Sequence, residues 1–472
     1  MTLTPSLARS LLCAVTLLHI PLLHGQSLEP DGMVILRDLS DRVGPRLTGS
    51  DGDAKAREWA IRQMRTAGLR NVHAEPWMLS SAWTRGTARA RLVSPFALDL
   101  AVLSYGWAGS TKGELEGDVV IVDRGALVAA GRGSGNWKGK VLLLLPRDAA
   151  HYDSLRGLAE LPAFLKAAEA AQAIAVIAPD SRPGVLLPHT GPISFPFHRS
   201  GMATLDLADE QVKLLARLVG GGAAVRVSVD VRNQFREGPV ESNNLVGEIA
   251  GSGRSEEVVL LGAHLDSWDI GTGSVDDGFG VAAVLAAART IAADEKAPRR
   301  TIRVVLFTGE EQGLLGSRHY VEQHQSELQN LVCAVVIDWG AGAMKSIPVA
   351  GHAELEAPLR EILGSTLRLN GVRPGNGYLT YTDAFPFTLA GVPGLAAYQD
   401  SPAYAQIGHS AADTLDKVQA SAMEQVSGAL AALARGIADS PTRFGRRFTP
   451  QETAASLEDL RVGLQLLGLW PF

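Results

Sequence analysis

The stretch of sequence that decides the fold covers residues 257–293 and reads EVVLLGAHLDSWDIGTGSVDDGFGVAAVLAAARTIAA. Its first part, Glu257–Ala263, is a short apolar run that predicts a buried strand, and its last part, Gly278–Ala293, predicts a helix. The alternation continues along the chain, at Thr301–Thr308, Ser317–His324, Leu331–Ile337 and Gly394–Tyr398. Strands that alternate with helices predict an α/β fold, with a mostly parallel central sheet flanked by helices.

The part of the chain before residue 257 has a different pattern of apolar and turn-forming residues. Residues 50–68 carry apolar side chains at helical spacing, and Ser50 and Gly68 suit the two ends of a helix. From about residue 105, short β-branched runs separated by glycine-rich turns predict a β-rich domain inserted into the α/β domain. We therefore divide the chain into four parts: residues 1–25, residues 26–104 of the α/β domain, an insert over 105–238, and the rest of the α/β domain over 239–472.

Composition excludes several classes of protein. The chain has 472 residues, of which 46% are hydrophobic and 20% charged, and this composition predicts a globular protein with two or three domains rather than a disordered chain. The net charge of −6 provides no basic field to attract phosphates, so we expect no nucleic-acid partner.

Residues 1–25 follow the pattern of a signal peptide. Arg9 precedes a largely apolar run over 11–23, which is too short to span a membrane, and small and polar residues follow it. A buried N-terminal helix is the alternative. Cleavage would remove Cys13 and leave Cys333 alone in an apolar run, so no intramolecular disulfide is expected. These features predict an exported protein without a membrane span, either periplasmic or secreted.

Ligand-type side chains follow the predicted strands at five places. Because the carboxyl ends of parallel strands meet at one edge of a sheet, we expect the loops that follow them to converge on one crevice. These loops carry His264 and Asp266, Asp276 and Asp277, Glu310 and Glu311, Asp338, and His409. Each side chain alone has an ordinary explanation as a helix cap, a turn residue or a loop residue, but their joint placement predicts a site.

Imidazole and carboxylate ligands together suit zinc, and five such positions exceed what one tetrahedral ion uses. They suit two ions that share a bridging carboxylate. In an extended segment the side chains of His264 and Asp266 point the same way, so Asp266 can orient the imidazole. If their segment is also extended, Glu310 and Glu311 point to opposite sides, which lets one bind metal while the other acts as a general base.

These motifs resemble those of the co-catalytic zinc exopeptidases. The resemblance rests on His264–Gly278, Phe307–Ser317, Asp338 and His409–Thr414, and the run His-Leu-Asp-Ser-Trp-Asp at 264–269 is most similar to the carboxypeptidase Q group. Residues 44–50 and 137–141 are also similar to that group, the latter to part of a protease-associated domain. The resemblance covers nearly all of residues 30–440.

The resemblance implies two Zn²⁺ per chain and assigns a role to each site residue. His264 and Asp338 would bind one ion, Glu311 and His409 the other, and Asp276 both. Glu310 would be the general acid and base, and Asp266 the orienting residue. Two positions depart from related aminopeptidases: Gly408 stands where some have a tyrosine that assists the oxyanion, and Thr382–Phe387 lacks a histidine found in the similar segment.

The expected activity is therefore hydrolysis of short peptides by a zinc exopeptidase of carboxypeptidase or dipeptidase type. An aminopeptidase with the same metal site is the nearest alternative, followed by a glutaminyl cyclase-like acyltransferase and a non-catalytic receptor-like ectodomain. The resemblance also implies a homodimer. The apolar C-terminal stretch, residues 448–472, is expected to pack either on the α/β domain or on a partner subunit.

Overall fold

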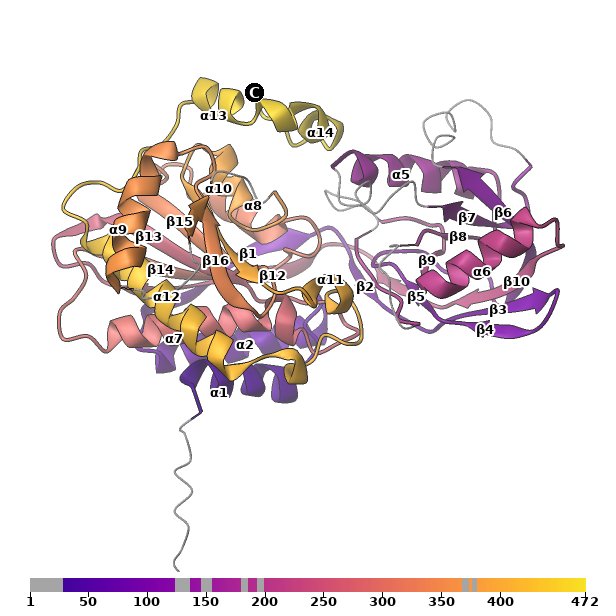
Figure 1. Cartoon of the computed structure of the whole chain (residues 1–472), viewed down its shortest axis with the longest axis horizontal. Helices are drawn as coiled ribbons and strands as arrows, with labels where there is room; N and C mark the ends of the chain where they lie inside the picture. The colour runs from indigo at the N-terminus through magenta and orange to yellow at the C-terminus, as the bar shows by residue number, and fades with distance from the viewer. Residues whose placement is uncertain are drawn as a thin grey trace, which may run out of the picture.

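The computed structural model describes residues 29–123, 136–145, 155–179, 186–192, 199–366, 373–375 and 380–472. The expected signal peptide, residues 1–25, lies outside these residues. Two lobes lie side by side, each built on its own eight-stranded sheet (Figure 1). We call residues 29–79 and 240–472 the core lobe and residues 88–231 the inserted lobe. None of the helices in the described ranges is long and apolar enough to cross a membrane.

The sheet of the core lobe has the strand order β1-β12-β14-β13-β15-β18-β16-β17. Its strands are β1 (Arg70–Leu79), β12 (Val240–Ile249), β13 (Arg254–His264), β14 (Arg300–Phe307), β15 (Leu331–Ile337), β16 (Ala343–Pro348), β17 (Arg373–Gly375) and β18 (Gly394–Asp400). The four central strands β14, β13, β15 and β18 run parallel, which confirms the predicted parallel centre. Antiparallel pairing joins β1 and β12 to this centre on one side and β16 on the other.

Helices cover both faces of this sheet, because the central strands are nearly continuous apolar runs whose side chains are apolar on both faces. One face packs against α1 (Asp31–Asp38), α2 (Asp51–Thr66), α7 (Phe279–Ala292), α9 (Glu356–Thr366) and α12 (Ala420–Asp439). The other face packs against α8 (Leu315–Gln323) and α10 (Phe385–Leu389). The helix predicted over residues 50–68 is confirmed as α2, and the Ser50 side chain caps it by accepting from the Asp53 N–H.

The inserted lobe has the strand order β4-β3-β10-β6-β7-β8-β9-β5. Its strands are β3 (Ala88–Ser94), β4 (Leu98–Leu100), β5 (Val102–Ser104), β6 (Leu115–Asp123), β7 (Lys140–Leu145), β8 (Ala175–Ile177), β9 (Thr204–Leu207) and β10 (Arg226–Val231). The lobe thus begins before residue 105. It also holds the helices α5 (Leu155–Ala170) and α6 (Asp209–Gly220), which the strand-like texture of the segment did not predict. Strands β6 to β9 are parallel.

Two connections join the lobes. The chain leaves the core lobe through β2 (Ala82–Thr84) and returns through β11 (Gln234–Arg236), and these two strands pair as an antiparallel ribbon. The C-terminal segment holds the helices α13 (Pro450–Ser456) and α14 (Arg461–Leu466). Leu457, between them, and Leu464 of α14 cluster with Leu314 and Phe385 of the core lobe, and α14 also contacts α5 of the inserted lobe. Figure 1 shows this C-terminal segment reaching across from one lobe toward the other.

Candidate metal centre

The carboxyl ends of three adjacent parallel strands supply most of the candidate site. His264 is the last residue of β13, Glu310 and Glu311 follow β14, and Asp338 directly follows β15. Asp276 belongs to the turn η3 (Ser274–Gly278), which leads into α7. His409 follows the short helix α11 (Tyr404–Ile407). The strand ends therefore bring these residues together because parallel strands of one sheet all end at the same edge.

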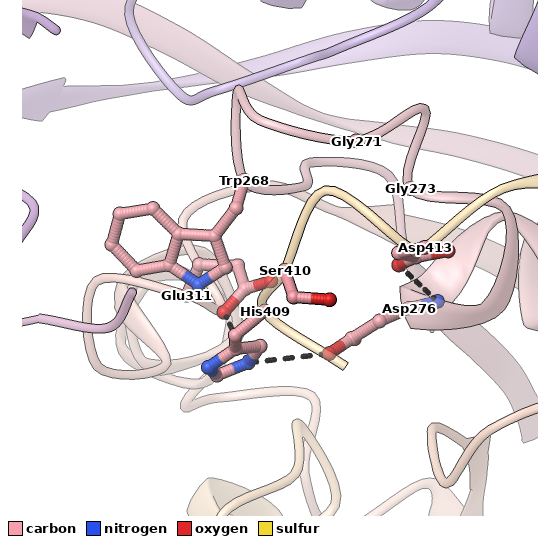
Figure 2. A pocket seen from close by; sticks show the side chains of 8 residues that line it. All are labelled: Trp268, Gly271, Gly273, Asp276, Glu311, His409, Ser410 and Asp413. Carbon is pink, nitrogen blue, oxygen red and sulfur yellow. Dashed lines mark hydrogen bonds and ion pairs between the residues drawn. The ribbon is translucent and has the colours of Figure 1, made fainter. Parts of the chain in front are cut away.

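These residues form two groups that share Asp276. His264 Nε2 lies 3.1 Å from Asp276 Oδ1 and 3.5 Å from Asp338 Oδ1. His409 Nε2 lies 3.2 Å from Asp276 Oδ2 and 3.2 Å from Glu311 Oε2 (Figure 2). Within each group, one ligand atom from each residue lies within 4.8 Å of the others. Each oxygen of Asp276 thus faces a different imidazole, as a carboxylate does when it bridges two metal ions.

Asp266 connects the two halves of the site. Its carboxylate accepts hydrogen bonds from the backbone N–H groups of Glu310 (3.3 Å) and Glu311 (3.4 Å) and from the Thr48 hydroxyl (2.9 Å). Its Oδ1 also lies 3.5 Å from Nδ1 of His264. The structure therefore places Asp266 where it holds the loop after β14 as well as the first imidazole.

Burial and crowded charge shift the pKa values of the site. Burial raises the pKa of Glu310 well above its usual value, and the neighbouring carboxylates of Asp338 and Glu311 raise it further. Burial also raises the pKa of Asp338 to about 6. Although burial lowers the pKa of His409, the carboxylates of Glu311 and Asp276 outweigh it and raise that pKa to about 10. Cations are therefore strongly favoured among these carboxylates.

Arg46 and Asp413 brace the loop that carries Asp276. The fully buried Arg46 guanidinium donates to the backbone carbonyls of Leu265 (2.6 Å), Thr272 (2.8 Å) and Gly273 (2.9 Å). Asp413 accepts from the backbone N–H groups of Val275 (2.7 Å) and Asp276 (3.1 Å). Arg46 and Thr48 lie in the segment 44–50, which the sequence already marked by its family resemblance. The sequence did not indicate which backbone and side-chain groups these two residues bind.

Tyr404 supplies a hydroxyl at the centre of the site. It donates a 2.7 Å hydrogen bond to Asp276 Oδ2, the oxygen that also faces His409. Sequence reasoning missed this residue, because it lies five positions before His409 rather than directly before it, where Gly408 stands. The core lobe therefore has a phenol at the metal centre despite the glycine.

The inserted lobe also contacts the site. The backbone N–H of Thr190 donates to the His409 carbonyl at 2.8 Å, and His409 has a left-handed φ of 58° that this bond helps to hold. His189 of the inserted lobe is buried, with Nε2 2.8 Å from the Gln406 carbonyl oxygen. Arg85, between β2 and the inserted lobe, pairs with Asp269 at 2.8 Å. The inserted lobe thus forms one wall beside the His409 loop.

Comparison with known proteins identifies the family. The model of peptidase family M28 matches residues 244–434, the part of the chain that contains every candidate metal ligand. A solved structure of a peptidase M28 precursor from Shewanella amazonensis is 30% identical to this chain, covers 89% of it and 95% of that protein, and superposes with a TM-score of 0.76. The chain belongs to peptidase family M28.

Curated relatives and further structures extend this result. Carboxypeptidase Q of Rattus norvegicus is 29% identical over 85% of this chain and 84% of its own length, and that of Xenopus laevis is 28% identical over 79% of each. The zinc aminopeptidase of Bacillus subtilis is 19% identical, with a TM-score of 0.66, and covers 89% of this chain and 97% of its own. At that identity the aminopeptidase shows only that this M28 member shares its fold.

Proposed function

We propose that this M28 peptidase is a dizinc exopeptidase that hydrolyses short peptides, of carboxypeptidase or dipeptidase type. The observation that carries the proposal is the pair of metal-ligand groups that share Asp276. The donor set fits zinc, because each group combines one imidazole with two carboxylates. A non-catalytic receptor-like ectodomain has no need for a complete ligand set beside a further glutamate such as Glu310, so we do not favour it.

In the proposed site His264 and Asp338 would hold one ion, Glu311 and His409 would hold the other, and Asp276 would serve both. When bound, zinc polarises the scissile carbonyl and lowers the pKa of a water molecule. Glu310, in the loop after β14 beside Glu311, would accept the proton of this water and return it to the leaving amine. Asp266 orients His264 and fixes the backbone of the Glu310 loop.

Tyr404 is the residue we propose to stabilise the oxygen that becomes negatively charged. Its hydroxyl lies at the shared carboxylate, within 2.7 Å of Asp276 Oδ2. A phenol proton placed where charge develops stabilises that charge more in a buried site than in water. In this proposal Tyr404 assists the oxyanion, as a tyrosine at the position of Gly408 does in some related aminopeptidases.

The inserted lobe is proposed to be a protease-associated domain that limits access to short substrates. Its support is the contact of Thr190 with the His409 backbone, beside Arg85 of the connecting segment, which binds both Thr190 and Asp269. Export is proposed from the signal-like residues 1–25, and a homodimer from the family resemblance. Neither proposal affects the chemistry of the site.

The carboxypeptidase type is favoured over the aminopeptidase type by the carboxypeptidase Q relatives, which align along most of this chain. A panel of N-blocked dipeptides, free dipeptides and aminoacyl-nitroanilides tests the choice. We expect hydrolysis of free dipeptides, with or without N-blocked ones, in a zinc-dependent reaction. Cleavage of nitroanilides without cleavage of N-blocked dipeptides would assign the aminopeptidase activity instead.

A further inference from the structure

Trp268 lies against one half of the metal centre. It belongs to the loop after β13, and its side chain is 4% exposed. Its ring packs edge-on against the His409 ring, with centroids 5.9 Å apart, and against Trp107 of the inserted lobe at 6.5 Å. Trp268 therefore contacts both a candidate metal ligand and the inserted lobe.

The indole nitrogen of Trp268 is buried and has no hydrogen-bond partner among the described residues. Figure 2 shows it on the side of the ring that faces Glu311 and His409. Because this nitrogen is closed off from solvent, a substrate cannot reach it as it stands. A buried N–H group without an acceptor is costly, so its acceptor must lie within the wall of the site.

Glu311 offers the matching acceptor. Its Oε1 is also buried and without a partner among the described residues, whereas its Oε2 lies 3.2 Å from His409 Nε2. Trp268, Glu311 and His409 line the same small cavity (Figure 2). One unpaired donor and one unpaired acceptor thus lie in the same cavity, and pairing them would satisfy both groups.

We propose that the Trp268 indole N–H donates a hydrogen bond to Glu311 Oε1 and so leaves Oε2 to bind metal together with His409. Trp268 is then a positioning residue for one metal ion only. In the other group His264 lies against Asp276 Oδ1 and Asp338, whereas His409, the ring that Trp268 packs against, lies against Asp276 Oδ2. Outer contacts of this kind orient a ligand and strengthen its hold on the metal.

This inference rests on the proposed dizinc function, and the experiment separates the two. Metal-free wild type and Trp268→Phe are titrated with Zn²⁺ against a chelating dye. Phenylalanine keeps a ring but lacks the donor, so we expect the Kd of one zinc site to rise about 10- to 100-fold and that of the other to stay within about twofold. In the cobalt-loaded variant, the absorption bands of one site should shift.

Trp59→Phe is the matched control, because Trp59 is as buried as Trp268 and its indole donates to the Asp38 carboxylate, between helices α1 and α2 that carry none of the candidate ligands. It should leave both zinc affinities unchanged. Equal weakening of both sites in Trp268→Phe, or no weakening of either, would overturn the inference while the dizinc function stands. If wild type binds fewer than two zinc ions, the proposed function fails and the inference with it.

A crystal structure of the zinc-loaded wild type tests the same inference if the variant does not fold. We expect the Trp268 Nε1 to Glu311 Oε1 distance to fall to about 3 Å, the usual length of an N–H···O hydrogen bond. A distance beyond hydrogen-bonding range, with both zinc ions bound, would overturn the inference.

Discussion

The two sheets of the molecule have similar architecture but different chemistry. Each has eight strands, with parallel strands at its centre and helices packed against it. In the described part of the chain, both metal-capable groups lie in the core lobe, at the ends of β13, β14 and β15 and in the loops beside them. The inserted lobe contributes backbone and packing contacts to the same site, such as that of Thr190 with His409. The side chains at the strand ends, rather than the type of sheet, determine the function.

The largest effect is expected from Glu310→Gln. Glutamine keeps the shape but cannot accept the proton of the attacking water, so turnover should fall by about 10²- to 10⁴-fold while metal content is unchanged. The matched control is Glu322→Gln. Glu322 lies in α8, the helix that follows the Glu310 loop, and its side chain is exposed. Steady-state kinetics and elemental analysis measure both. Near-normal turnover in Glu310→Gln would remove it from the mechanism.

The next effect concerns two buried arginines of the core lobe. Arg46 braces the Asp276 loop. Arg300 is the first residue of β14, at the opposite edge of the sheet, and donates to the carbonyls of Ser440 and Thr442. Replacing either with methionine removes several hydrogen bonds to backbone carbonyls, and for Arg300 also the ion pair with Glu257, and should lower the free energy of unfolding by roughly 3 kcal/mol. Only Arg46→Met should also weaken zinc binding.

Urea unfolding of the two metal-free arginine variants and zinc titration of the folded proteins separate these effects. Equal zinc affinities in Arg46→Met and Arg300→Met would show that Arg46 stabilises the fold without shaping the metal centre.

A smaller effect is expected where the two lobes meet. A Cβ on Gly106 would lie 2.4 Å from the Trp268 ring, so Gly106→Ala should displace that ring and cost roughly 1–3 kcal/mol of stability. Gly220→Ala at the end of α6 meets nothing within 4 Å and should change stability by less than about 0.5 kcal/mol. Thermal unfolding with matched kinetics measures both. Activity retained in Gly106→Ala would mean that the inserted lobe does not influence the site through Trp268.

The smallest effect concerns Cys333. This thiol is fully buried in β15, and burial raises its pKa to about 12, so almost no thiolate exists near neutral pH. In a Cys13→Ser background we expect no reaction with a thiol reagent at pH 8 until the protein is unfolded. Rapid labelling of the folded protein would show that β15 opens far more readily than its burial indicates.

The sequence allowed the parallel centre of the core lobe and the metal candidates to be predicted for one physical reason. Strands β13, β14 and β15 contain apolar runs, and each has ligand-type residues at or just after its carboxyl end, where the three strands meet at one edge. The site residues other than these ligands depend on long-range contacts. Arg46, for example, donates to carbonyls more than 200 positions away, and a backbone acceptor leaves no trace in the sequence.

The inserted lobe was predicted less completely. Its strands β6, β7, β8 and β10 coincide with β-branched or apolar runs in the sequence. The helices α5 and α6 were not predicted, because they lie among the glycine-rich turns of the same segment. Its contact with the site also passes through a backbone group, the Thr190 N–H, which no side-chain pattern reveals. The orientation of Trp268 likewise depends on Gly106 and Trp107 of the other lobe.

The central claim is that Asp276 is shared by two metal ions. The most direct test is the zinc content, by equilibrium dialysis and elemental analysis, of wild type, Asp276→Asn and Asp338→Asn. We predict about two zinc ions per wild-type chain, loss of tight binding at both sites in Asp276→Asn, and loss at one site in Asp338→Asn. One zinc ion per wild-type chain, or two tightly bound ions in Asp276→Asn, would contradict the account.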